Sequence, residues 1–182
     1  MDNLIINLLM IVGLLIAAAY FAMSEIALAG SRKLRLTRLA EKGDKRAKMV
    51  LSLKENPGSF FSVVQIGINA VAILGGIIGE AAFTRLFSDL FRRFVPPEAL
   101  ESVAFSAAFI TVTLLFILFA DLIPKRVAMT RPESTALGMV RLMQCFIVIF
   151  KPLVWLLTVT SGCIMKLFGI PTVTKEKITN ED

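Results

Sequence analysis

The residues best suited to chemistry are polar side chains that interrupt long apolar runs of the sequence. Ser24 and Glu25 lie within the run 4–30, and Asp121 directly follows the run 102–120. Such side chains are costly inside a membrane, so they mark a functional site by default. Hydroxyl, amide and carboxylate oxygens suit Mg²⁺, Ca²⁺ or Na⁺ better than zinc or copper. The run 59–83 adds Ser62, Gln65 and Asn69 to this set.

The polar residues of the run 59–83 have helical spacing. Ser62, Gln65 and Asn69 stand at i, i+3 and i+7, which places them on one face of a helix. Such a face requires another helix beside it, either to build a cation site or simply for hydrogen bonds between helices. Small residues near the far end of the run would permit close helix contact or dimerisation: Gly75, Gly76 and Gly79.

The end of the run 102–120 combines a carboxylate with a proline. Pro124 has no N–H, so the carbonyl of Ala120 loses its i+4 partner in an α-helix. Broken helices supply oxygen ligands to cations in this way at membrane sites. The simpler alternatives are an ordinary span end at Asp121 and, for Glu25, contact with water or a basic residue.

Composition and charge favour an integral membrane protein. The chain has 182 residues, of which 56% are hydrophobic, and its apolar runs are about 20 residues long, enough to cross a bilayer. We therefore expect an all-α membrane domain over residues 1–170. Histidine is absent, which removes the common nucleophile–base pairs and zinc motifs, and we expect no enzyme. The net charge of +6 reflects basic loops rather than nucleic-acid binding.

The distribution of basic residues predicts the topology. Nine lysines and arginines lie within residues 31–57 and three within residues 85–100. The positive-inside rule then places residues 31–57 in the cytoplasm and the N-terminus outside, with three membrane helices. Residues 31–55 also alternate basic and apolar positions, as amphipathic juxtamembrane helices do.

The apolar region 137–170 is harder to assign because Lys151 and Pro152 lie near its middle. A lysine at mid-bilayer costs about 3 kcal/mol, and a proline interrupts the helical hydrogen bonds. We therefore expect a hairpin of two short helices on the cytoplasmic side rather than a fourth span. Residues 171–182 would begin a cytoplasmic linker.

Three short motifs, in order along the chain, resemble those of the CorC/CNNM transmembrane module. They read Phe21-Ala22-Met23-Ser24-Glu25-Ile26-Ala27, Gln65-Ile66-Gly67-Ile68-Asn69 and Asp121-Leu122-Ile123-Pro124-Lys125. The breaker Asn56-Pro57-Gly58 before the second motif also fits, so the resemblance covers essentially the whole chain.

The resemblance implies a homodimer in the bacterial inner (plasma) membrane with three membrane helices per subunit. It also implies a following pair of cytosolic CBS modules, and Mg²⁺ export that is coupled to Na⁺ in some members. By motif, the cation would be surrounded by Ser24, Gly67, Asn69 and Asp121, with Ala120 beside them. Supporting or coupling positions would be Glu25, Ser62, Gln65 and Pro124.

One departure from the family pattern affects the expected cargo. The third motif usually reads Gly-Glu, whereas this chain has Ala120-Asp121. The shorter carboxylate withdraws its oxygens, while Mg²⁺ demands near-ideal octahedral geometry at about 2.1 Å. Three hypotheses remain: Mg²⁺ export by alternating access, export of a polyamine or diamine, and a sensor or scaffold that transports nothing.

Overall fold

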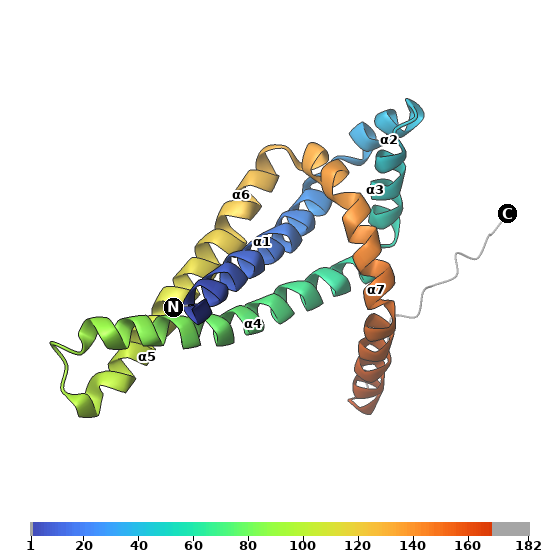
Figure 1. Ribbon diagram of the computed structural model, residues 1–182. Coiled ribbons are helices and arrows are strands. Elements are labelled where there is room, and N and C mark those ends of the chain that lie inside the picture. The colour runs from blue at the N-terminus through green and yellow to red at the C-terminus, as the bar shows by residue number, and fades with distance from the viewer. Residues whose placement is uncertain (1, 169–182) are drawn as a thin grey trace.

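The computed structural model describes residues 2–168, and every regular element among them is a helix (Figure 1). The predicted linker, residues 171–182, lies outside this part. The helices, in chain order, are α1 (Asp2–Gly30), α2 (Lys33–Glu41), α3 (Lys45–Glu55), α4 (Pro57–Phe91), α5 (Pro97–Leu115), the π-helix η1 (Phe116–Leu122), α6 (Ile123–Thr130) and α7 (Pro132–Leu167).

Three long apolar helical segments form the bundle. The elements α5, η1 and α6 follow one another without a loop, so Pro97–Thr130 is a single helical rod. α1 packs against both α4 and this rod, and α4 also packs against α5 (Figure 1). The buried side of α4 repeats every three or four residues, as one helix face does: Phe60, Val63, Val64, Gly67, Val71, Gly75, Gly79 and Ala82.

Four helices, rather than the expected three, are long and apolar enough to cross a membrane. The fourth is α7, so the predicted hairpin over residues 137–170 is wrong. Pro152 lies inside α7 without ending it. A proline removes one hydrogen bond, and a helix of 36 residues retains many others. Lys151 lies on the exposed side of α7.

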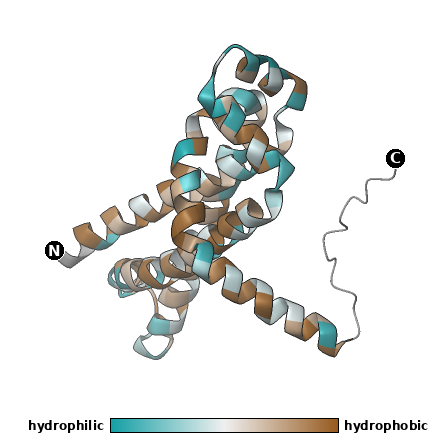
Figure 2. Cartoon of the chain, turned by 90° about the vertical axis from the view of Figure 1, so that its right-hand side faces the viewer, coloured by the Kyte–Doolittle hydropathy of each residue, from teal (hydrophilic) through white to brown (hydrophobic). Residues whose placement is uncertain are grey.

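α7 leaves the other long helices at a wide angle, and its C-terminal half projects from the bundle (Figure 1). Its buried residues all lie between Glu133 and Met143. Beyond them, apolar side chains such as Val148 and Trp155 are exposed, and Figure 2 shows apolar residues along the projecting part. The helical membrane class predicted from the sequence is therefore confirmed, with a different arrangement of the last segment.

The basic region 31–57 forms two short helices, α2 and α3, which meet at a tight turn. Gly43 adopts a φ of +94° there, a conformation that favours glycine. Asp44 caps α3 by accepting a hydrogen bond from the Arg46 N–H at 2.8 Å, and the Arg46 side chain beside it lowers the pKa of Asp44. Leu36 and Val50 turn inward, so both helices present one apolar side to the bundle.

Candidate cation site

Two carboxylates from different helices share one ammonium group. The Lys125 Nζ of α6 lies 2.7 Å from the Asp121 carboxylate of η1 and 3.7 Å from the Glu25 carboxylate of α1. The three side chains are 32%, 50% and 30% exposed, respectively. Two negative charges thus face one positive charge.

Asp121 is positioned by a local widening of its helix. In η1 the Ile123 N–H donates to the Leu118 carbonyl, five residues earlier instead of four. Pro124 follows directly and lies buried in the first turn of α6. A proline ring crowds the carbonyl four residues before it, and a π-helical turn relieves such crowding. The helix is therefore widened at the proline rather than broken, and it continues to Thr130.

Ala120 fixes the depth of this turn in the bundle. It is 6% exposed and packs in a small cluster with Ala18 of α1 and Val71 of α4. Small side chains on these helices allow their backbones to approach closely. The neighbouring Asp121 is consequently held beside α1, within reach of the Lys125 ammonium that also contacts Glu25.

Ser24 is buried but is directed toward another partner. Its hydroxyl donates to the Tyr20 carbonyl at 2.8 Å and lies 3.3 Å from the Met139 sulfur of α7. The Tyr20 hydroxyl also contacts α7, through the Met139 carbonyl at 2.8 Å. Ser24 lines a narrow, mainly apolar cavity between α1, α3, α4 and α7. Its hydroxyl therefore serves the contact between α1 and α7 in this conformation.

The glycines of α4 divide into two groups. Gly67 lies against the Phe21 ring of α1, where an added methyl group would come within 2.6 Å of ring carbons. Gly75 lies in the same way against Phe116 of η1, and Gly79 lies against Val112 of α5. A methyl group on Gly76, by contrast, would meet no atom within 4 Å.

The predicted polar face of α4 points away from the rest of this chain. Gln65 and Asn69 are exposed and Ser62 is partly exposed. They lie opposite the buried face of α4 that contacts α1 and α5. The structure therefore brings Glu25 and Asp121 together, while Ser24 and Asn69 point elsewhere.

Sequence reasoning overlooked Lys125 as a member of the site. It is the last residue of the third motif. Its spacing of four residues from Asp121, on one side of a helix, was the available signal.

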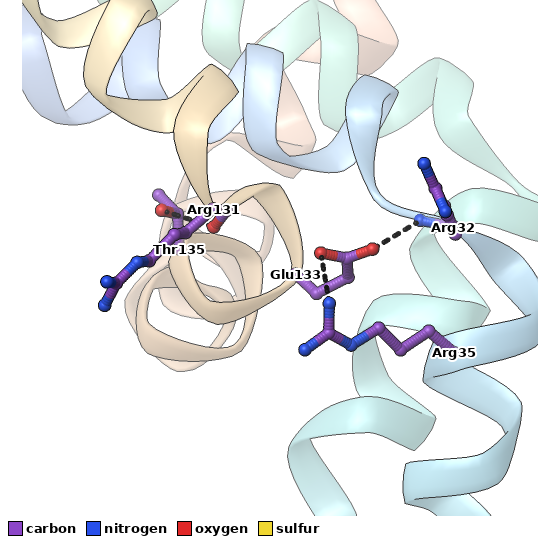
Figure 3. A network of polar contacts seen from close by, with 5 residues as sticks. All are labelled: Arg32, Arg35, Arg131, Glu133 and Thr135. Carbon is purple, nitrogen blue, oxygen red and sulfur yellow. Dashed lines mark hydrogen bonds and ion pairs between the residues drawn. The ribbon is translucent and has the colours of Figure 1, made fainter.

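A second polar network, also unforeseen, joins the start of α7 to the α1–α2 junction (Figure 3). Glu133, only 7% exposed, accepts hydrogen bonds from the Arg32 backbone N–H at 3.4 Å and from the Arg35 guanidinium at 3.5 Å. Thr135 donates to the Arg131 carbonyl at 3.0 Å. An acidic residue just after Arg131-Pro132, at the start of a helix, was the sequence signal for this network.

Lys54 of α3 caps the C-terminal end of α1 next to this network. Its ammonium donates to the carbonyls of Leu28 and Ser31 at 2.8 and 2.6 Å, which are carbonyls of the last turn of α1 and just beyond it. Burial lowers the pKa of Lys54, and the negative charge of Glu133 acts in the opposite direction. These contacts hold α1, α3 and α7 together at the basic end of the bundle.

Within residues 5–168, whose side chains the structure describes, no three acidic, cysteine or histidine side chains lie close enough to hold a metal ion. A divalent cation at Glu25 and Asp121 would have to take its remaining ligands from water, amides or carbonyls. An ammonium group makes no such demand, because its N–H donors bind carboxylate oxygens directly.

Comparison with known proteins adds to this geometry. The model of the cyclin M transmembrane N-terminal domain, CNNM, matches residues 9–182. The polyamine export protein of Salmonella typhimurium is 50% identical over 178 residues, and that of Haemophilus influenzae is 47% identical over 176. A UPF0053 protein of Synechocystis is 36% identical over 180 residues. These alignments cover 97% of the chain but only about two fifths of each relative, 40%, 41% and 40% respectively.

Proposed function

Because the chain belongs to the CNNM transmembrane domain family, as its motifs indicated, we propose that it is the membrane domain of a polyamine exporter. The observation that carries the proposal is the single alkylammonium held between Glu25 and Asp121. Relatives at 46–50% identity are named polyamine export proteins, which supports the same cargo.

The chemistry of the site fits the end of a polyamine. Each end of a simple diamine is a primary ammonium on a flexible carbon chain, the same group that Lys125 presents. Glu25 and Asp121 offer it two carboxylates from different helices. An ammonium that approaches a carboxylate more closely can form charge-assisted hydrogen bonds, which are about twice as strong as neutral ones. Two helices contributing one carboxylate each would also couple cargo binding to movement of α1 against the rod Pro97–Thr130.

Magnesium export, which the resemblance first favoured, has less support. Mg²⁺ needs six ligands in near-octahedral arrangement, and the polar face with Asn69 points away from Asp121. Na⁺ coupling would need a further cation site for which the described residues give no argument. We therefore treat Mg²⁺ as the competing cargo in the experiment.

The exposed polar face of α4 supports a homodimer. Gln65 and Asn69 would face lipid in a single copy, where unpaired amides are costly. Gly76 lies about two to three turns further along α4 and leaves open space beside the helix. A second copy packed along this face would bury the amides and use the space. We propose this arrangement for the assembled protein. A cytosolic CBS region, which the resemblance implies, would further require that α7 begin and end on the cytoplasmic side rather than cross the membrane.

The proposed orientation of the protein in the membrane is based on the positions of the basic helices α2 and α3. With α2 and α3 in the cytoplasm, Glu25 and Asp121 lie toward the cytoplasmic ends of their spans. Cargo would then enter the site from the cytoplasm, as export requires. The bacterial inner membrane is the proposed location.

The test is flux in proteoliposomes that contain the purified protein. Labelled 1,4-diaminobutane and Mg²⁺ are supplied separately and in competition, with empty liposomes as the control. We expect saturable diamine flux that excess Mg²⁺ reduces only weakly. Saturable Mg²⁺ flux without diamine flux would contradict the proposal, and diamine binding without any flux would favour a sensor or scaffold.

A further inference from the structure

We propose that the Lys125 ammonium occupies the cation site in the absence of cargo. The exported amine must then displace this ammonium in order to bind. This inference rests on the proposed function and concerns the regulation of the same site. It assigns to Lys125 a role opposite to that of a supporting residue: the side chain competes with the cargo.

The position of the ammonium group carries the inference. An ordinary ion pair between residues four apart on one helix would involve Lys125 and Asp121 alone, at 2.7 Å. The Lys125 Nζ also lies 3.7 Å from Glu25, which belongs to a different helix. The ammonium is therefore paired with both carboxylates that the cargo would need, rather than with one of them.

Displacement follows from the charges. Two ammonium groups cannot occupy the space between the same two carboxylates, because like charges at such distances repel strongly where water is scarce. The lysine side chain is a point charge on a flexible stem of four carbons, so it is able to leave. About a third of its surface, 32%, is exposed, which gives the stem somewhere to move.

The arrangement would serve a transporter in its empty state. Without Lys125, Glu25 and Asp121 would be two neighbouring carboxylates in an apolar span, an unfavourable arrangement. Lys125 neutralises one of these charges until cargo arrives. Lys125 also sets a minimum affinity for the cargo, because a cation binds only if it outcompetes the Lys125 ammonium. A diamine, with a second ammonium for contacts elsewhere, has an advantage over a monoamine.

The experiment measures the affinity of the purified protein for 1,4-diaminobutane by calorimetry. Lys125→Met removes the ammonium and keeps a similar stem, and Arg126→Met is the matched control with the same charge change at an exposed neighbour. We expect Lys125→Met to bind about tenfold more tightly and Arg126→Met to change little. Equal or weaker binding by Lys125→Met would overturn the inference and leave the proposed function intact.

A second measurement on the wild type guards against failure of the variant to fold. In a density map with bound diamine, the Lys125 ammonium should have left Asp121 and the diamine should occupy its place. A bound diamine with the Lys125–Asp121 contact unchanged would overturn the inference. Absence of diamine binding to both the wild type and a folded Lys125→Met variant would overturn the proposed function itself.

Discussion

Gly67 of α4 lies directly against the aromatic ring of Phe21 of α1, two residues of the motifs by which the chain resembles its family. The glycine is buried, and the ring occupies the space that any larger side chain would need. The motif glycine therefore has a packing role between the two helices. Four residues separate Phe21 from Glu25, so this contact lies one turn away from the cation site along α1.

Substitution of Gly67 by alanine should destabilise the protein, because the new methyl group would lie 2.6 Å from the Phe21 ring. Crowding of this kind costs about 1–3 kcal/mol. The matched control is Gly13→Ala in α1, where the methyl group meets open space and helix propensity alone favours alanine. Denaturant unfolding in detergent compares the two, and equal stability of both variants would contradict the observed packing.

The buried Glu133 should stabilise the junction of α1, α2 and α7. Glu133→Leu leaves the Arg32 N–H without its acceptor, which should lower the free energy of unfolding by about 1–3 kcal/mol. Glu41→Leu changes the same residue type at an exposed position of α2 and should have little effect. Thermal unfolding of both variants gives the comparison; a Glu133 variant as stable as the Glu41 variant would argue against the network.

Lys54 should give stability a characteristic pH dependence. Its pKa in the folded protein is lowered from 10.5 by burial, so the unfolded chain binds the proton more tightly. More protons bound in the unfolded state means that the unfolding free energy rises as pH increases toward 10.5. Lys54→Met should remove this rise, whereas the exposed control Lys48→Met should keep it. Unfolding measured between pH 8 and pH 10.5 tests the sign, and a fall attributable to Lys54 would disprove it.

The open space at Gly76 should matter only in the assembled protein. Gly76→Leu should raise the monomer fraction in detergent, because the side chain would enter the proposed contact between copies. Gly13→Leu is the control, at an exposed glycine of α1 that also has no atom within 4 Å of an added methyl group. Light scattering after size-exclusion chromatography gives the masses. An unchanged dimer in the Gly76 variant would remove this face from the interface.

Much of the helical architecture was predictable because long apolar runs have few alternatives in a membrane. The runs 4–30, 59–83 and 102–120 all lie within observed long helices. The hairpin predicted for the region 137–170 was wrong because neither Pro152 nor Lys151 prevents a long helix there. A single missing hydrogen bond and an exposed lysine are tolerated where the rest of α7 is continuous.

The candidate site was only partly predictable, because residue spacing within one helix does not show how the helices pack against each other. Spacing shows which residues share a helix face, as it did for Gln65 and Asn69, but it does not show which face packs within the chain. In α4 the face of Gly67, Val71 and Gly75 is the buried one. Likewise, the carboxylates at Glu25 and Asp121 were visible in the sequence, but the ammonium between them required the geometry of two helices.

The most direct test of the account is the affinity for 1,4-diaminobutane of variants at the two carboxylates. Glu25→Gln and Asp121→Asn keep the shape and remove one charge each, while Glu98→Gln does so at an exposed position of α5. The account predicts that binding weakens by about tenfold or more in each site variant, with Glu98→Gln close to the wild type. Unchanged affinity in both site variants would contradict the assignment of Glu25 and Asp121 as the amine site.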